Sequence, residues 1–101
     1  MTARRALSPT EVVTRLSKLG NGWALAGSGD NTAIEKTFKF ANYHETISFV
    51  NAVAFIANKL DHHPDLSVHY SRCVVRWRTH EPPGISALDF DAAARIEALS
   101  Q

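Results

Sequence analysis

Two short segments hold three of the chain's five histidines, and each segment also carries a carboxylate. Residues 61–64 read Asp-His-His-Pro, and residues 79–81 read Thr-His-Glu. Imidazole is the one side chain whose ordinary pKa, about 6.5, lets it both give and take a proton near neutral pH. A neighbouring carboxylate can fix the orientation of such a ring or increase its basicity. The pattern therefore predicts general acid–base chemistry on a small molecule, with His62, His63 and His80 as candidate groups.

Two other interpretations of these histidines stay open from the residues alone. One is a zinc site with three histidine ligands and a water. Adjacent histidines rarely bind one metal, however, and the chain has no His-x-x-x-His or Cys-x-x-Cys spacing, so we expect no metal. The other is that His62, His63 and His80 cap a helix or fill a loop without chemistry. Their position beside Asp61 and Glu81 favours the chemical interpretation.

Other side chains able to do chemistry are predicted to be structural. His44 opens a helix and His69 falls on a strand, and neither lies near a second titratable cluster. Cys73 sits in an apolar, β-branched stretch typical of a buried thiol, and a single cysteine cannot form an internal disulfide, which fits a reducing compartment. Trp23 and Tyr70 are predicted core or rim aromatics, although either could form a wall beside a flat aromatic substrate.

A long helix and a hairpin must position the histidines. The helix is expected over about residues 42–61 and ends before Pro64, because the residue preceding a proline is pushed out of the helical region. Strands follow at 68–70 and 73–79, and the second alternates buried and exposed positions with the period of two expected for a sheet. The hairpin can return His80 to the helix end that carries His62 and His63.

The remaining elements complete an α+β fold. Residues 8–11 form a capping box that opens a helix, and residues 20–22 end it. Strands at 23–26 and 34–40 flank a turn at 27–31, and a second capping box at 86–89 opens the final helix. The order α-β-β-α-β-β-α predicts one domain over residues 1–101, with a four-stranded antiparallel sheet and three helices packed on one face.

The apolar faces of these helices indicate where they pack. In the first and last helices, we expect the following residues to face inward: Val12, Val13, Leu16, Leu19, Leu88, Ala92, Ile96 and Leu99. The main stripe of the long helix is Ile47, Val50, Ala54, Ala57 and Leu60, broadened by Phe49, Val53, Phe55 and Ile56. A helix apolar over most of its circumference needs cover on more than one side. We therefore expect a homo-oligomer that forms through this helix.

Composition excludes several classes of partner. The 101 residues are 45% apolar and 21% charged, as in an ordinary globular domain. The net charge is +1 and no Lys/Arg stripe occurs, so nucleic acid is not expected as a partner. No window approaches 18 apolar residues, so no membrane span is expected. No apolar stretch follows Arg4 and Arg5, which argues against a secretory signal and favours the cytoplasm.

Further segments extend the histidine pattern over nearly the whole chain. They are residues 61–65, Tyr70, residues 79–81, residues 84–86 with Asp89, and residues 22–23, 38–40, 57–60 and 94–97. Together they resemble the pterin-4a-carbinolamine dehydratase family. The resemblance implies a lyase that removes water from 4a-hydroxytetrahydropterin to give quinonoid dihydropterin, which recycles the pterin cofactor of aromatic amino-acid hydroxylases. Family members are α+β proteins that form dimers or tetramers and need no metal or organic cofactor.

The resemblance also assigns roles to residues. It implies that His62 and His80 are the acid–base pair and that His63 mainly holds the pterin. Substrate contacts of the family fall at Asp61, Arg78, Thr79 and Glu81, in addition to the histidines. Trp23, Asn58 and Asp89 are expected to support the site, with Asp89 anchoring the loop or helix start behind His80.

Four residues depart from the family pattern. Asn58 stands where an acidic or basic residue is usual, Arg78 replaces a small polar residue, and Pro82 with Pro83 stiffens a loop. These changes could lower turnover or shift substrate preference. Members of the family also serve as dimerisation partners of other proteins, so a non-catalytic binding or assembly protein is the alternative function. The sequence leaves open which pterin is used, in which pathway, and whether the oligomer is a dimer or a tetramer.

Overall fold

The computed structural model describes residues 4–100. Its helices are α1 (Pro9–Leu19), α2 (Tyr43–Leu60) and α3 (Ala87–Glu97), and its strands are β1 (Ala24–Ala26), β2 (Ala33–Lys39), β3 (Asp65–Val68) and β4 (Arg72–Trp77). Short 3₁₀ turns lie at Gly29–Asn31 and Ala98–Ser100. The predicted order of helices and strands is confirmed.

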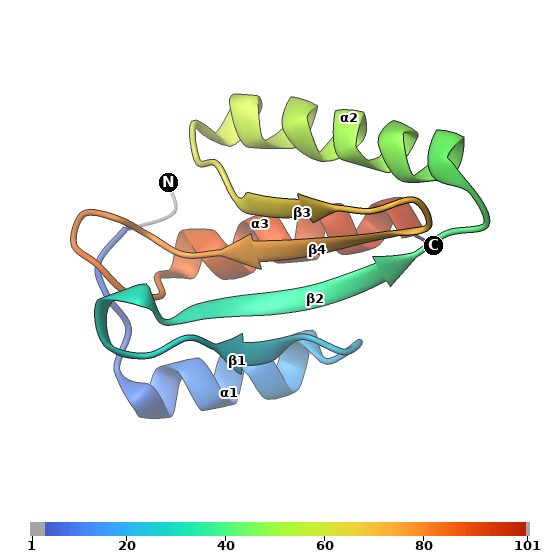
Figure 1. Ribbon diagram of the computed structural model, residues 1–101. Coiled ribbons are helices and arrows are strands. Elements are labelled where there is room, and N and C mark those ends of the chain that lie inside the picture. Colours follow the sequence, from blue (N-terminus) through green and yellow to red (C-terminus); the bar gives the residue numbers. More distant parts are fainter. Residues whose placement is uncertain (1–3, 101) are drawn as a thin grey trace.

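The four strands form one antiparallel sheet in the order β1-β2-β4-β3, and the helices lie on one of its faces (Figure 1). The predicted α+β architecture is therefore confirmed. Strand β4 shows why the sheet has one covered face. Cys73, Val75 and Trp77 are fully buried, whereas Val74 and Arg76 between them stay partly exposed, because successive side chains point to opposite faces.

The predicted caps define where the helices begin. Ser8 accepts a hydrogen bond from the Glu11 backbone N–H, and the Glu11 carboxylate accepts one from the Ser8 N–H. The hydrogen bond from the Arg5 guanidinium, with that from the Ser8 backbone, lowers the pKa of Glu11 to about 2. At α3, the Ser86 backbone N–H donates to the Asp89 carboxylate over 2.8 Å. Both capping boxes therefore form.

The buried face of α2 differs from the predicted one. Thr46, Phe49, Val53 and Ala57 are buried, whereas Ala54, placed in the predicted main stripe, is exposed. The buried face differs because Thr46, a polar residue, occupies a core position on α2. The Thr46 hydroxyl hydrogen-bonds the Tyr70 carbonyl over 2.9 Å and the Asn42 carbonyl over 3.0 Å, so it can be buried.

Two residues predicted to face inward are exposed. Val13 is 61% exposed, because consecutive residues lie about 100° apart around a helix and α1 buries the side that carries Val12. Leu99 is 43% exposed. The α-helix ends at Glu97, and the tighter 3₁₀ turn that follows rotates Leu99 out of the helical stripe.

The second hairpin is also shifted from its predicted position. Strand β3 begins at Asp65, directly after the proline, and ends at Val68, so that His69 lies in the turn and not on a strand. The His69 N–H closes this turn by donating to the Arg72 carbonyl over 2.9 Å. Strand β4 ends at Trp77, and Thr79 instead pairs with Gly84 in an isolated bridge.

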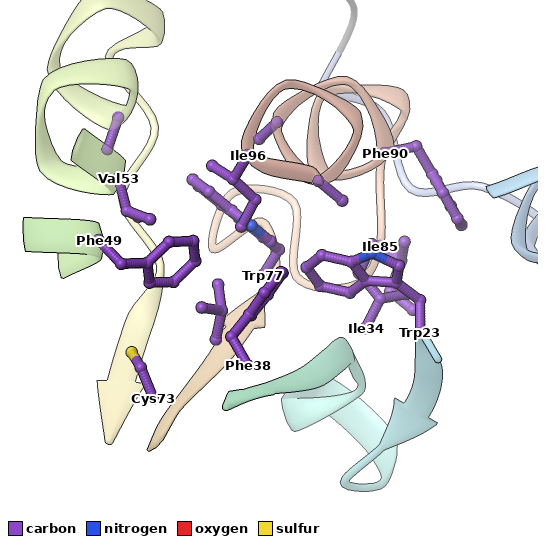
Figure 2. Packing of buried hydrophobic residues seen from close by; sticks show 14 of the residues in the cluster. Trp23, Ile34, Phe38, Phe49, Val53, Cys73, Trp77, Ile85, Phe90 and Ile96 are labelled. Atoms are coloured by element: carbon purple, nitrogen blue, oxygen red, sulfur yellow. The ribbon is translucent and has the colours of Figure 1, made fainter. Parts of the chain in front are cut away.

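Aromatic side chains fill the core between the sheet and the helices (Figure 2). The rings of Trp23 and Phe38 lie 5.9 Å apart, and those of Phe38 and Phe49 lie 4.6 Å apart. The Trp23 indole N–H donates to the Glu97 carboxylate of α3 over 2.9 Å. Cys73 lies in this core, and burial raises the pKa of its thiol, so it stays protonated and structural as predicted.

Candidate active site

A cavity of about 320 Å³ lies where the end of α2, the loop after β4 and the N-terminal segment meet. Its lining residues are Arg4, Asp61, His62, His63, Thr79, His80 and Glu81. The structure therefore brings the three candidate histidines, and the two carboxylates beside them in the sequence, around one hollow.

At the end of α2, the side chains of the adjacent His62 and His63 lie in different environments. Asp61 caps the helix in the left-handed conformation, with φ of 51° and ψ of 45°. The His62 backbone N–H then donates to the Ala57 carbonyl over 3.1 Å, which closes the helix and turns the chain. As a result His62 is buried, with only 6% of its surface exposed, whereas His63 is exposed.

A buried carboxylate holds the ring of His62. His62 Nε2 lies 2.5 Å from Asp89 Oδ1, and Asp89 is fully buried. The other oxygen, Oδ2, accepts hydrogen bonds from the Thr79 hydroxyl over 2.9 Å and from the Ser86 N–H over 2.8 Å. Because an ionised carboxylate only accepts hydrogen bonds, His62 donates through Nε2–H and keeps the lone pair on Nδ1. The ring also stacks on Trp77, with centroids 5.5 Å apart and planes 15° apart.

The sequence missed this contact. The capping role expected of Asp89 is present, since it binds the Ser86 N–H, but its second partner is His62. Helix α3 packs against α2 and β4, and only this packing brings residues 62 and 89 together. A capping box predicts local hydrogen bonds and contains no signal for a partner so distant in the chain.

The ring of His63 is held by a neutral partner. Its Nε2 lies 3.0 Å from the amide oxygen of Asn58, one turn back on α2. Since an amide oxygen only accepts, His63 donates through Nε2–H and keeps its Nδ1 lone pair. Asn58, predicted to support the site, therefore contacts the ring of His63.

His80 belongs to a tight loop at the opposite wall. Thr79 and Gly84 exchange backbone hydrogen bonds of 2.8 and 3.1 Å, which close the loop that carries His80 and Glu81. Both His80 and Glu81 are exposed. Thr79 itself is buried, and its hydroxyl is engaged by Ser86 and Asp89, so its side chain fixes the loop.

Two predicted site residues, Arg78 and Trp23, neither line this cavity nor hydrogen-bond its histidines. Arg78 donates to the Asp30 carbonyl over 3.4 Å, in the turn between β1 and β2. Strand alternation explains this, because Arg78 and Thr79 point to opposite sides of the chain. Trp23 lies in the core, where it packs against Phe38.

Arg4 lines the cavity although the sequence analysis gave it no role there. Its Nη2 donates to the Asp61 carbonyl over 2.6 Å. The sequence offers no signal for this contact, because 57 residues separate the two positions.

The other candidate residues stay outside the cavity. His44 is exposed in the first turn of α2, and His69 lies 3.0 Å from the Ser67 hydroxyl. Tyr70 is exposed and stacks on Tyr43, with ring centroids 6.3 Å apart.

Within residues 4–100, no group of three His, Cys, Asp or Glu side chains is placed to hold a metal ion. Over the same residues, no helix has the length and apolar character needed to cross a membrane.

The cavity has the groups needed for paired proton transfers. His62 offers a lone pair whose tautomer is fixed by a carboxylate, and the exposed imidazoles of His63 and His80 can exchange protons with water. Asp61 and Glu81 offer hydrogen-bond acceptors to the N–H groups of a ligand.

Known proteins resemble this chain in sequence and in fold. A sequence profile of the family described as Pterin 4 alpha carbinolamine dehydratase matches residues 5–99. A protein of Paracidovorax citrulli (strain AAC00-1), provisionally named pterin-4-alpha-carbinolamine dehydratase, is 71% identical over 97 residues, which cover 96% of this chain and 83% of that protein.

Two solved structures share the fold. The crystal structure of a transcriptional coactivator/pterin dehydratase from Brucella melitensis has a TM-score of 0.88 at 31% identity, and covers 96% of this chain and 100% of that one. A pterin dehydratase-like protein identified as a RuBisCO assembly factor in the alpha-carboxysome has a TM-score of 0.67 at 20% identity, over 81% of this chain and 93% of that one.

Proposed function

Because the chain belongs to the Pterin 4 alpha carbinolamine dehydratase family, we propose that it is a lyase that converts a 4a-hydroxytetrahydropterin into quinonoid dihydropterin and water. The observation that carries the proposal is the gathering of His62, His63 and His80 around one cavity, with the tautomer of His62 fixed by Asp89. This activity would return an oxidised pterin cofactor to its reducible form.

The reaction needs one base and one acid. The C4a–O bond breaks, and the departing hydroxyl takes a proton and leaves as water. The N5 proton leaves as the C4a=N5 double bond forms, so proton gain and loss balance. His62 takes the N5 proton at Nδ1, because the Asp89 carboxylate stabilises the imidazolium that results. His80 gives the proton to the hydroxyl, and its exposure lets it regain one from water.

The other cavity residues hold the substrate. His63, with its ring fixed by Asn58, accepts a hydrogen bond at Nδ1. The carboxylates of Asp61 and Glu81 accept hydrogen bonds from the amino and ring N–H groups of the pterin. Thr79 acts as a positioning residue through Asp89. No metal or organic cofactor takes part in these steps.

We further propose that one domain over residues 1–101 works in the cytoplasm as a homo-oligomer assembled through α2. Support for assembly comes from one side of α2 whose apolar side chains stay exposed: Tyr43 is 51% exposed, and Ala54, which lies on the same side of the helix, is exposed as well. A second copy would remove this surface from water.

The activity is tested by following the decay of the 4a-carbinolamine absorbance in the presence of the purified protein. Wild type should accelerate the decay, and the double variant His62→Ala/His80→Ala should lose about 10²-fold or more, the usual contribution of positioned proton transfer. The matched control is His44→Ala/His69→Ala, which removes two histidines outside the cavity and should keep the wild-type rate. A chelator should not change the rate.

A wild-type rate equal to that of buffer would contradict the proposal. The alternative is then a binding or assembly protein on the same scaffold. The two solved relatives carry such roles in their names, one as a transcriptional coactivator and one as a RuBisCO assembly factor.

A further inference from the structure

The ring of His62 has a second support besides Asp89. Trp77, the last residue of β4, points toward the helices, because it alternates along the strand in step with the buried Cys73 and Val75. Its indole stacks on the His62 imidazole, with ring centroids 5.5 Å apart and planes 15° apart. Asp89 therefore holds the imidazole at its Nε2 edge, and Trp77 covers one of its faces.

Trp77 can affect a bound substrate only through His62. The indole is fully buried and does not line the histidine cavity, whereas His62 does. Figure 2 shows the indole among the buried side chains of the core. A ligand in the cavity would therefore meet the imidazole and not the indole behind it.

The indole of Trp77 carries a cost that packing alone does not explain. Within residues 4–100, its buried Nε1–H has no hydrogen-bond partner, which destabilises the folded state. The other tryptophan, Trp23, donates its indole N–H to Glu97. Leucine or phenylalanine would fill an apolar site without burying an N–H group. What the indole adds beyond volume is a large π face, and that face lies on His62.

The π face matters because His62 becomes a cation when it takes a proton. A cation within about 6 Å of the centroid of an aromatic ring is attracted to its electron-rich face, and tryptophan gives the strongest attraction. The attraction increases where water is excluded, and His62 is only 6% exposed. A neutral imidazole gains no such attraction, so the indole favours the protonated ring over the neutral one.

The other two cavity histidines lack this arrangement. The ring of His63 is held by the neutral amide of Asn58, and His80 is exposed. Over residues 4–100, neither ring stacks on an aromatic side chain. His62 is thus the cavity imidazole whose surroundings best stabilise a positive charge, which suits the group that takes a proton.

We propose that Trp77 is a positioning residue whose indole face stabilises the protonated ring of His62 and so accelerates the step in which His62 takes the N5 proton. This proposal rests on the proposed dehydratase function. The effect of Trp77 should be smaller than that of Asp89, because a carboxylate in hydrogen-bond contact attracts a cation more strongly than an aromatic face does.

The test is a series in which residue 77 is tryptophan with no, one, two or three fluorine atoms on its ring. A Trp23→Phe background leaves Trp77 as the only tryptophan, so the label is confined to one site. Fluorine withdraws electron density from the indole face and changes its size little. Across the series kcat should fall stepwise, by about tenfold in all. KM should stay constant, because the neutral imidazole of the ground state gains nothing from the indole.

Conventional variants of Trp77 give a second readout. Trp77→Leu should lose about tenfold in kcat, and Trp77→Phe, which keeps a weaker aromatic face, should recover part of that loss. The matched control is Phe38→Leu, which removes an aromatic ring that packs against Trp23 and Phe49 in the same core. This control should lower Tm and keep kcat, measured below the Tm of each variant.

The fluorinated series decides the outcome even if Trp77→Leu does not fold. A kcat that is the same for all four indoles would overturn the proposal, since packing alone predicts that result. A loss that appears only in KM would also overturn it, because Trp77 would then shape the binding site and not the proton transfer. A wild type that fails to accelerate the reaction would instead overturn the dehydratase function, before any variant is compared.

Discussion

At the scale of single residues, Asp89 decides which nitrogen of His62 is available for chemistry. Its carboxylate sits between the ring and two donors from the loop and helix start, Thr79 and Ser86, so its position is fixed from both sides. A fully buried carboxylate would be costly without such donors. The hydrogen bonds that offset the cost of burying Asp89 therefore also fix the position of the carboxylate that orients His62, the proposed base.

Replacement of Asp89 by asparagine should impair catalysis by changing the tautomer of His62. The amide NH₂ can face Nε2, and the proton of the imidazole then moves to Nδ1, where the proposed base needs a lone pair. We expect kcat to fall by about 10²-fold or more. The ¹⁵N chemical shifts of the His62 ring should show the change from the Nε2–H to the Nδ1–H form.

The matched control is Asp91→Asn, two residues further along α3, where the carboxylate pairs with Arg95 at the surface. This variant should keep both kcat and the His62 tautomer. If Asp89→Asn kept wild-type turnover, the assigned role of Asp89 would be wrong.

At the scale of elements, α2 has two separate tasks. Its C-terminal end presents His62 and His63, while one side of the helix, with Phe49 and Val53, closes the core. A further side carries Tyr43, Ile47 and Ala54, which are one turn or a whole number of turns apart along the helix and stay wholly or partly exposed. This side is the surface through which we propose that copies assemble.

A charge placed on that side should disrupt assembly. In sedimentation velocity at micromolar concentration, wild type should form a dimer or tetramer, and Ala54→Glu should shift the protein to monomer. A carboxylate at this position would have to be buried without a partner in the interface. Ala54 is exposed in the protomer, so the substitution should leave the fold intact.

The matched control is Ser48→Glu, an exposed position about 120° around α2 from Ala54. It adds the same charge to the same helix and should leave the oligomer unchanged. A wild type that sediments as a monomer would contradict assembly through α2, as would an Ala54→Glu variant that remains oligomeric.

At the scale of the whole molecule, the sequence predicts what local chemistry determines. Capping boxes, prolines and alternating strands predict every helix and strand in order, and the residues that flank Pro64 predict where α2 ends. Local sequence patterns do not predict the positions of side chains that depend on tertiary contacts. The sequence indicates neither that Thr46 is buried nor that Asp89 meets His62, because the partners are distant in the chain. For the same reason it places Arg78 in the site and overlooks Arg4.

The most direct test of the central claim is a crystal structure of the protein with a non-reacting dihydropterin. The account predicts one pterin ring in the cavity, with His62 Nδ1 and a nitrogen of His80 within about 2.6–3.2 Å of its reacting edge, and His63 at hydrogen-bond distance from the same ring. A pterin bound elsewhere, or a ring in the cavity that His62 and His80 do not both reach, would contradict it.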